Sequence, residues 1–404
     1  MKVNNIILVL LIFSFSDNYL KAILGFSFFD DIANILILVL GLIYMLNKQG
    51  VNQLKNKTFT LLFLFYILIA FMFLLVSINA FFYELYKLLV FLFFIPIVSS
   101  LNTESIKNLE KNLLKFFLTL LFINSFVIVL QYIISPNITT IFGVSNVYID
   151  RADNMNRMSG LFENVNIYGD LCLLIYLFNE IISKNRRYRL LKILSIISIL
   201  ISTSKHAIIG LLIILIIQNY KLIYKNIAKG FYLIIIFISI GFFAYTINQK
   251  SIENKITSYT YLFSKTEDLN GIDEGRIEGR GQNLIDGINI MKRNNFHGNG
   301  LGTWGDYSST FSNENNIGFE NNTMSDSSLI HILVEQGYVS ILYFLLLFSG
   351  IFSVSKKYKK FFLLLMFSYL IFITVTMGFS SGSWPILFSY IYIRLLYSKT
   401  LPIE

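Results

Sequence analysis

The chain alternates between long apolar segments and short polar ones along nearly its whole length. The apolar segments approach the ~20 residues that an α-helix needs to cross the ~30 Å core of a bilayer. The pattern therefore predicts an all-α integral membrane fold with about twelve transmembrane helices. The predicted spans are 4–24, 32–47, 58–78, 81–100, 113–135, 160–182, 189–203, 206–220, 227–247, 327–354, 360–378 and 383–398.

One polar segment, 249–325, interrupts this pattern between the ninth and tenth spans. It contains seven Lys/Arg and ten Asp/Glu, and nine of the chain's 23 glycines lie between Gly271 and Gly305. The chain thus divides into transmembrane helices 1–9 in 1–248, a large loop in 249–325 and transmembrane helices 10–12 in 326–404. Because crossing a bilayer needs no such loop, we expect the chemistry to take place on its side of the membrane.

Composition agrees with a membrane protein. Of the 404 residues 55% are hydrophobic, and the mean hydropathy of +0.64 lies outside the range of soluble domains. The first apolar segment resembles a signal peptide, but Ser16-Asp17-Asn18 is no small-residue cleavage site. We therefore expect a retained first span.

The distribution of Lys and Arg predicts the orientation. Loops after even-numbered spans are basic, and the short loops on the other side carry few basic residues. By the positive-inside rule both termini are cytoplasmic and the large loop is external. The net charge of +9 is spread over many loops, so nucleic-acid binding is a poor explanation for it. The basic loop residues are Lys48, Lys55, Lys57, Lys107, Lys111, Lys115, Lys184, Arg186, Arg187, Arg189, Lys192, Lys221, Lys225, Lys229, Lys356, Lys357, Lys359 and Lys360.

Several chemistries lack a sequence signal. The single cysteine, Cys172, gives no disulfide framework. His206, His297 and His331 are far apart in the sequence, and there is no HExxH motif or cysteine cluster, so no metal site is predicted. No GxxxxGK[ST] loop is present either, and neither nucleotide hydrolysis nor a cofactor is expected.

Two short motifs fall on the predicted external side. Arg157 and Gly160 precede the sixth span together with Asn164 and Asn166, and an arginine at a helix start suits a phosphate ligand. The alternative is an interfacial anchor with a helix cap. Lys205 lies in the polar turn 202–206 between spans seven and eight, and taken alone this turn is better explained as a connector.

A third, longer motif begins in the large loop. After Arg276 and Gly279-Arg280, apolar residues Leu284, Ile288 and Met291 recur at helical spacing, which predicts an amphipathic helix on the outer leaflet. Such a helix would hold Arg280 at headgroup height, where its planar fork fits a pyrophosphate. The glycine run 298–302 that follows is a turn signal and allows a close backbone approach to a ligand. The alternative is a loop that only covers the bundle.

Asp326 opens the tenth span at the external boundary. One interpretation is an N-cap carboxylate, a role worth ~1 kcal/mol. The other is a general base near the membrane surface. From its position alone the cap is the simpler of the two.

Taken together, the chain resembles the superfamily of bacterial lipid-linked polysaccharide polymerases (Wzy type) and O-antigen ligases. The resemblance rests on the order and sidedness of the motifs between Arg157 and Gly337, and on the topology of the whole chain. The residues before span six are similar to that superfamily's pattern, with Val165 where proline is commoner. The turn at Lys205 departs from its Ser-Arg-Gly-like form, and a lysine lacks the bidentate fork of arginine.

One departure separates the two branches. Ligases usually carry a His-Asn pair nine residues before a Glu-x-Gly. Here Glu335-Gln-Gly337 is preceded at that distance by Asp326-Ser327. The absent histidine makes the chain look more like the polymerase branch.

The resemblance implies a GT-C-like, metal-independent, inverting glycosyltransferase of the bacterial cytoplasmic membrane that uses no cofactor. Its donor would be a growing glycan on undecaprenyl pyrophosphate and its acceptor the terminal sugar of another lipid-linked repeat unit, as in O-antigen (lipopolysaccharide) or capsule synthesis. A chain-length regulator and a flippase would be its partners. The implied site residues are Asp326 as general base, with Glu278 and His297 in reserve; Arg280, with Arg157, Arg276 and Lys205, against the pyrophosphate; and Trp304 and Tyr307 against sugar faces, or Trp304 as an interface anchor.

Two rival functions remain. An O-antigen ligase would use the same donor and fold with a lipid A-core acceptor. A lipid-linked oligosaccharide flippase also fits about twelve spans, but transporters tend to carry ionisable residues near the midplane and inverted repeats. The sequence shows no repeat, and its intramembrane charges lie mostly near the ends of the predicted spans.

Overall fold

The structure, a computed structural model, describes residues 7–10, 12, 29–46, 57–99, 101–142, 158–162, 164–182, 188–202, 204–225, 280–304, 327–375 and 383–399. These residues form helices and turns, and none of them lies in a strand. An all-helical fold is therefore confirmed for the described part of the chain. The predicted ninth span, 227–247, and most of the first lie outside it.

The helices follow the predicted order of spans. They are α2 (Phe29–Leu46), α4 (Lys57–Phe73), α5 (Ile78–Ser99), α6 (Thr103–Ile133), η1 (Pro136–Phe142), α7 (Val165–Ile182), α8 (Arg189–Ser202), α9 (Lys205–Lys225), α12 (Arg280–Arg293), α14 (Ser328–Gln336), α15 (Val339–Ser349), η5 (Gly350–Phe352), η6 (Lys356–Tyr358), α16 (Lys359–Val375), α17 (Ser383–Leu396) and η7 (Tyr397–Lys399).

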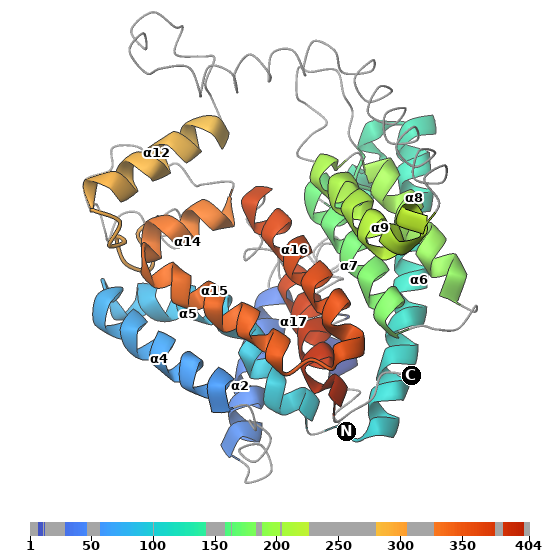
Figure 1. Cartoon of the computed structure of the whole chain (residues 1–404). Helices are drawn as coiled ribbons and strands as arrows, with labels where there is room; N and C mark the ends of the chain where they lie inside the picture. Colours follow the sequence, from blue (N-terminus) through green and yellow to red (C-terminus); the bar gives the residue numbers. More distant parts are fainter. Residues whose placement is uncertain are drawn as a thin grey trace, which may run out of the picture.

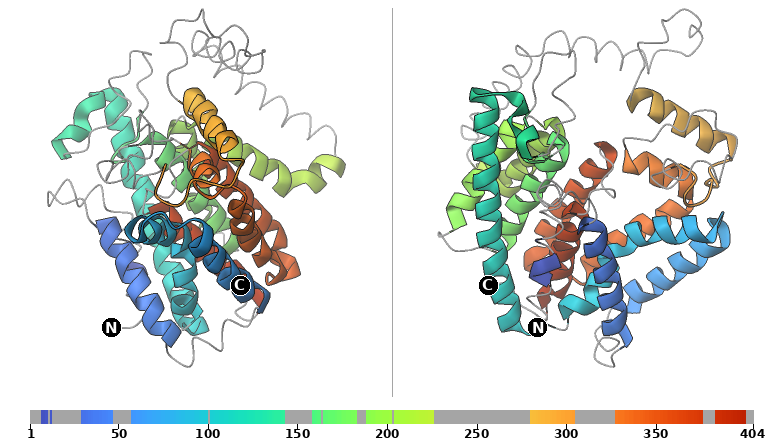
Figure 2. Two further views of the ribbon diagram at one scale, coloured as in Figure 1. Left: turned by 90° about the vertical axis from the view of Figure 1, so that its left-hand side faces the viewer. Right: turned by 180° about the vertical axis from the view of Figure 1, so that it is seen from behind.

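Helices α7 and α17 form the centre of the bundle. From Trp384 to Leu395 every residue of α17 is buried, and α17 packs against α5, α7 and α16. Helices α8 and α9 cover α7 on one side, while α4 and α15 pack together on the other side of α17 (Figure 1). Figure 2 shows α6 running along the edge of the bundle over most of its height.

The outer surface of the bundle is strongly apolar. On α4 the residues Leu61, Leu64 and Leu68 are each more than half exposed, and on α6 so are Phe122 and Phe126. Exposed apolar faces of this extent are typical of contact with lipid. Among the described residues, α6 and α7 are by length and composition each able to cross a membrane, and four further apolar helices are shorter. The count of about twelve spans stays a prediction.

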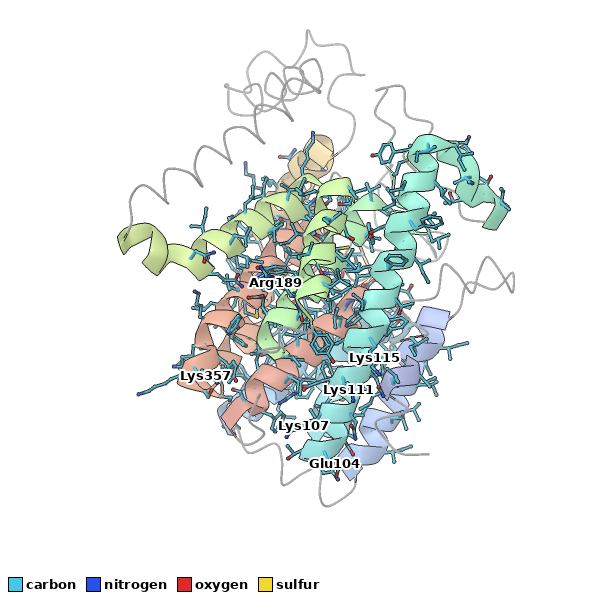
Figure 3. All side chains as sticks on the ribbon, turned by 90° about the vertical axis from the view of Figure 1, so that its right-hand side faces the viewer. Glu104, Lys107, Lys111, Lys115, Arg189 and Lys357 are labelled. Atoms are coloured by element: carbon cyan, nitrogen blue, oxygen red, sulfur yellow. The ribbon has the colours of Figure 1, made fainter. Side chains whose placement is uncertain are left out.

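Four of the lysines predicted to be cytoplasmic lie toward one end of the described molecule. Figure 3 shows Lys107, Lys111 and Lys115 on the lower part of α6 and Lys357 at the same end, with α12 at the opposite end. Helix α6 begins ten residues before the predicted span because Asn102 caps it, accepting a hydrogen bond from Ser105 N at 2.7 Å. The lysines between spans four and five thus lie on a helical extension.

The predicted tenth span, 327–354, is not continuous. It divides into α14 and α15 at Gly337, whose φ of +51° lies in the left-handed region. Apolar residues continue on both sides of Glu335-Gln-Gly337, so hydrophobicity alone predicted one long helix through this point. Because of the break α14 and α15 take different directions (Figure 1).

Candidate functional site

Helix α12 packs directly on α14. A Cβ on Gly287 would lie 2.5 Å from Cγ2 of Ile330 and 3.2 Å from that of Val334, so only glycine permits this approach. Next to this contact Ile290 and Trp304 pack on Val334 and are buried. The predicted helix is therefore present, but its buried face is centred on Gly287 and Ile290, whereas Ile288 is 39% exposed.

The glycine-rich loop 294–304 is pressed against the end of α14. Asn299 N and Gly300 N donate to the carbonyl oxygens of Val334 and Glu335 at 3.0 and 2.9 Å. In addition, Leu301 N donates to Leu74 O at 2.9 Å, which joins the loop to the turn before α5. The close backbone approach that the glycines allow is therefore made, among the described residues, to α14 and to the 74–76 turn.

Helices α12 and α14 run in the same general direction. Gly287 lies against Ile330 and Val334, and after α12 ends, Tyr338 N donates to Phe296 O at 3.0 Å. Both helix N-termini consequently lie at the same end of the pair, toward the end of α16 (Figure 1). Helix N-termini carry partial positive charge, so this end favours an anion.

Ser327 caps α14. Its Oγ accepts a hydrogen bond from Ile330 N at 3.4 Å and donates one to Ile373 O of α16 at 3.2 Å. The capping role considered for Asp326 is thus filled by its neighbour. This hydroxyl also fixes the start of α14 against α16.

Below the loop, α5 and α14 bring three ionisable side chains together. His331 Nε2 lies 3.0 Å from Glu335 Oε2, one helical turn away, and 3.7 Å from Glu84 Oε2. The two carboxylates are buried, at 2% and 1% exposure, and the imidazole is partly buried. Trp304 N donates to Glu335 Oε1 at 2.9 Å, so loop 294–304 contacts this group directly.

A second polar network joins α7 to the start of α9. His206 Nε2 lies 2.8 Å from Asp170 Oδ2 and 3.3 Å from Ser204 Oγ. Since one ring nitrogen faces both partners, this is not the relay of a Ser-His-Asp triad, in which the two ring nitrogens are used separately. Lys205, the first residue of α9, is exposed beside this network.

The motif before α7 is held by two amides from α6. Asn124 Nδ2 donates to Ser159 O at 3.1 Å and its Oδ1 accepts from Leu161 N at 2.8 Å. Gln131 Oε1 accepts from Gly160 N at 2.9 Å. The turn 158–162 is therefore fixed in position immediately after Arg157.

The predicted site residues differ in what the structure describes. Arg157, Arg276 and Asp326 lie outside the described residues, as do the reserve base Glu278 and the predicted sugar-stacking residue Tyr307. Arg280 is described only as the first residue of α12. His297 is exposed, with its ring edge-on to Tyr338 at 6.0 Å. Trp304 is 6% exposed and packed in the α12–α14 contact. The roles assigned to all of these residues stay predictions.

The comparison with protein families bears on the same region. Residues 190–345 match the family model described as O-antigen ligase (Wzy_C). The match runs from α8 to α15, so it includes α9, α12 and α14. It supports the O-antigen ligase/polymerase superfamily, whose members are integral proteins of the bacterial inner membrane that act on lipid-linked oligosaccharides, and it does not separate the two branches. No curated protein matches the chain.

Sequence reasoning missed the group formed by Glu84, His331 and Glu335. The spacing of His331 and Glu335, at i and i+4, was a usable signal because it places both side chains on one face of a helix. Glu84 carried no such signal. It lies on α5, far from α14 in the sequence, and comes close to His331 only because these parts of the chain lie together in the fold.

Proposed function

We propose that the chain is a polysaccharide polymerase of the outer face of the bacterial cytoplasmic membrane. It transfers a growing glycan from undecaprenyl pyrophosphate to the terminal sugar of another lipid-linked repeat unit. The match to the O-antigen ligase family supports the reaction class and the lipid-linked substrate. Asp326 in place of the ligase histidine supports the polymerase branch.

The observation that carries this proposal is the shared direction of α12 and α14. Gly287 and the Phe296–Tyr338 hydrogen bond align the two helices, so the end that begins with Arg280 and the end that follows Asp326 belong together. An anionic leaving group would meet the positive ends of both helices and a guanidinium. The basic partners proposed beside Arg280 are Arg157, Arg276 and Lys205.

In the proposed reaction the acceptor hydroxyl oxygen attacks the anomeric carbon of the donor sugar. The bond from that carbon to the pyrophosphate oxygen breaks, and the electron pair leaves with undecaprenyl pyrophosphate. Asp326 accepts the hydroxyl proton, and attack from the opposite face inverts the anomeric centre. Arg280 stabilises the charge that develops on the leaving group. Because Ser327 caps α14, the carboxylate of Asp326 is not needed for that role.

Ligation is the second candidate function, because the matching family model is itself described by that activity. Donor and leaving group would be the same, and only the acceptor would differ. For a ligase the acceptor would be lipid A-core in place of the terminal sugar of a second repeat unit.

The test is complementation of a polymerase-null strain, with polysaccharide length read on a gel. Wild type is expected to restore a ladder, while Arg280→Ala and Asp326→Asn, at normal protein levels, leave single repeat units. Arg293→Ala is the matched control, since it removes the exposed arginine at the other end of α12. A wild type that restores attachment without changing length would favour the ligase, and ladders from both variants would contradict the site.

A further inference from the structure

We propose that Glu84, His331 and Glu335 bind one first-row divalent cation, Mn²⁺ or Zn²⁺, which ties α5 to α14. The proposal is independent of the transfer reaction above. The cation would be structural: by joining α5 to α14 it would stabilise the helix on which loop 294–304 lies. It would have no part in catalysis.

The geometry of the three side chains carries the proposal. Their ligand atoms, Glu84 Oε2, His331 Nε2 and Glu335 Oε2, all lie within 4.8 Å of one another, and the two distances from the imidazole are 3.0 and 3.7 Å. Ligands at ~2.0–2.2 Å from a shared ion are separated by roughly 3–3.6 Å in the usual coordination geometries. The 3.0 Å separation from Glu335 falls within that range and the 3.7 Å separation from Glu84 lies just above it, so a small movement of the Glu84 side chain would bring the ligand atoms around one ion.

The charges of the three side chains also favour a bound cation. Within this group, two buried carboxylates face one imidazole. Placing like charges together in a buried site is costly unless a cation lies between them. A divalent ion among the three ligand atoms removes that repulsion and leaves the imidazole neutral for coordination.

The surroundings of Glu335 fit a ligand. Its second oxygen, Oε1, accepts the hydrogen bond from Trp304 N, which orients the carboxylate with Oε2 toward His331. Ligating carboxylates are commonly held by such an outer hydrogen bond. The His331 side chain is 15% exposed, which provides a route for an ion to enter.

The combination of one imidazole nitrogen and two carboxylate oxygens indicates which ion would bind. Imidazole nitrogen suits Zn²⁺ and other first-row metals, while carboxylates suit Mn²⁺ as well. Ca²⁺ takes six to eight oxygen ligands and gains little from an imidazole. We therefore expect Zn²⁺ to displace Mn²⁺ from the site and Ca²⁺ not to do so.

The experiment titrates Mn²⁺ into the purified, chelator-treated full chain and follows the bound ion by electron paramagnetic resonance. Wild type is expected to bind one equivalent, and Glu84→Gln, His331→Gln and Glu335→Gln are each expected to weaken binding by more than about 100-fold. His206→Gln is the matched control, because that buried histidine faces one carboxylate only within its network. Unchanged binding in the three ligand variants, or equal loss in the control, would overturn the proposal.

A variant that fails to fold would also lose binding, so a second measurement uses the wild type alone. Pulsed electron paramagnetic resonance of the Mn²⁺-bound protein should show coupling to one imidazole nitrogen, and ¹⁵N-labelled histidine should change that coupling. The absence of stoichiometric Mn²⁺ or Zn²⁺ binding, or of any imidazole nitrogen beside the bound ion, would refute the site.

Discussion

Gly298 and Gly337 lie in backbone contact. A Cβ on Gly298 would lie 2.6 Å from both the backbone carbonyl carbon of Gln336 and the backbone carbonyl oxygen of Glu335. A Cβ on Gly337 would meet the backbone carbonyl oxygen of Phe296. Both residues have positive φ, +83° and +51°. The glycine-rich loop is thus fitted onto the break between α14 and α15, and this fit positions α12 above α14.

Gly337→Ala is expected to separate the loop from this break. The added Cβ meets backbone atoms that cannot rotate away, and the left-handed φ alone costs about 1–3 kcal/mol. We expect a lower midpoint of thermal unfolding in detergent and loss of polymer. Gly210→Ala is the control, because its Cβ would meet side-chain atoms of Leu173 and Ile371 and no backbone atom within 4 Å among its three nearest neighbours. Equal stability of the two variants would contradict the contact.

Ser327 and Asp326 are expected to respond differently. Ser327→Ala removes the cap of α14 and should lower the free energy of unfolding by about 1 kcal/mol, whereas Ser327→Asn, which keeps a capping oxygen, should lose less. Asp326→Asn should leave the unfolding midpoint within error of wild type and abolish polymerisation. Thermal unfolding midpoints and gel ladders of the Ser327 and Asp326 variants test these two predictions. A lower unfolding midpoint for Asp326→Asn would indicate that Asp326 has a structural role.

Asn124→Ala is expected to release the turn after Arg157. It removes the hydrogen bonds to Ser159 O and Leu161 N, which together are worth about 1–3 kcal/mol. If that turn holds Arg157 against the donor, the KM for the lipid-linked donor should rise by about tenfold with less change in kcat. Ser125→Ala, the next residue of α6, is the control because its hydroxyl faces Ser198 instead. A pure loss of kcat would argue against this positioning role.

Arg394→Ala is expected to destabilise the bundle without a direct effect on the site. Arg394 Nε lies 2.5 Å from Glu110 Oε1, and both side chains are buried. Removing one member of such a pair costs about 3–5 kcal/mol, because the other charge stays buried. The double variant Glu110→Gln/Arg394→Met should recover part of this loss in thermal unfolding. Transfer activity per folded molecule should stay near wild type, since this region of α6 is at the end opposite α12.

The pattern of apolar residues was sufficient to predict the helices. Ten predicted spans correspond to described helices, because a backbone in lipid must satisfy its hydrogen bonds internally and so leaves helix as the main option. The helix beginning at Arg280 was also predictable from local spacing. The break at Gly337 was not predictable in this way, because it also depends on contacts with Phe296 and Gly298, which are distant in the sequence.

The candidate site also has features that the sequence predicted and features that it did not. The sequence by itself determined the class of protein, the separate polar segment and the match of residues 190–345 to the O-antigen ligase family model, because these depend on residue types in order along the chain. Only the tertiary structure decided that α12 and α14 share a direction, that Ser327 caps α14, and that Glu84 meets His331 and Glu335. Those relationships depend on how distant helices pack, and packing joins residues that no local pattern connects.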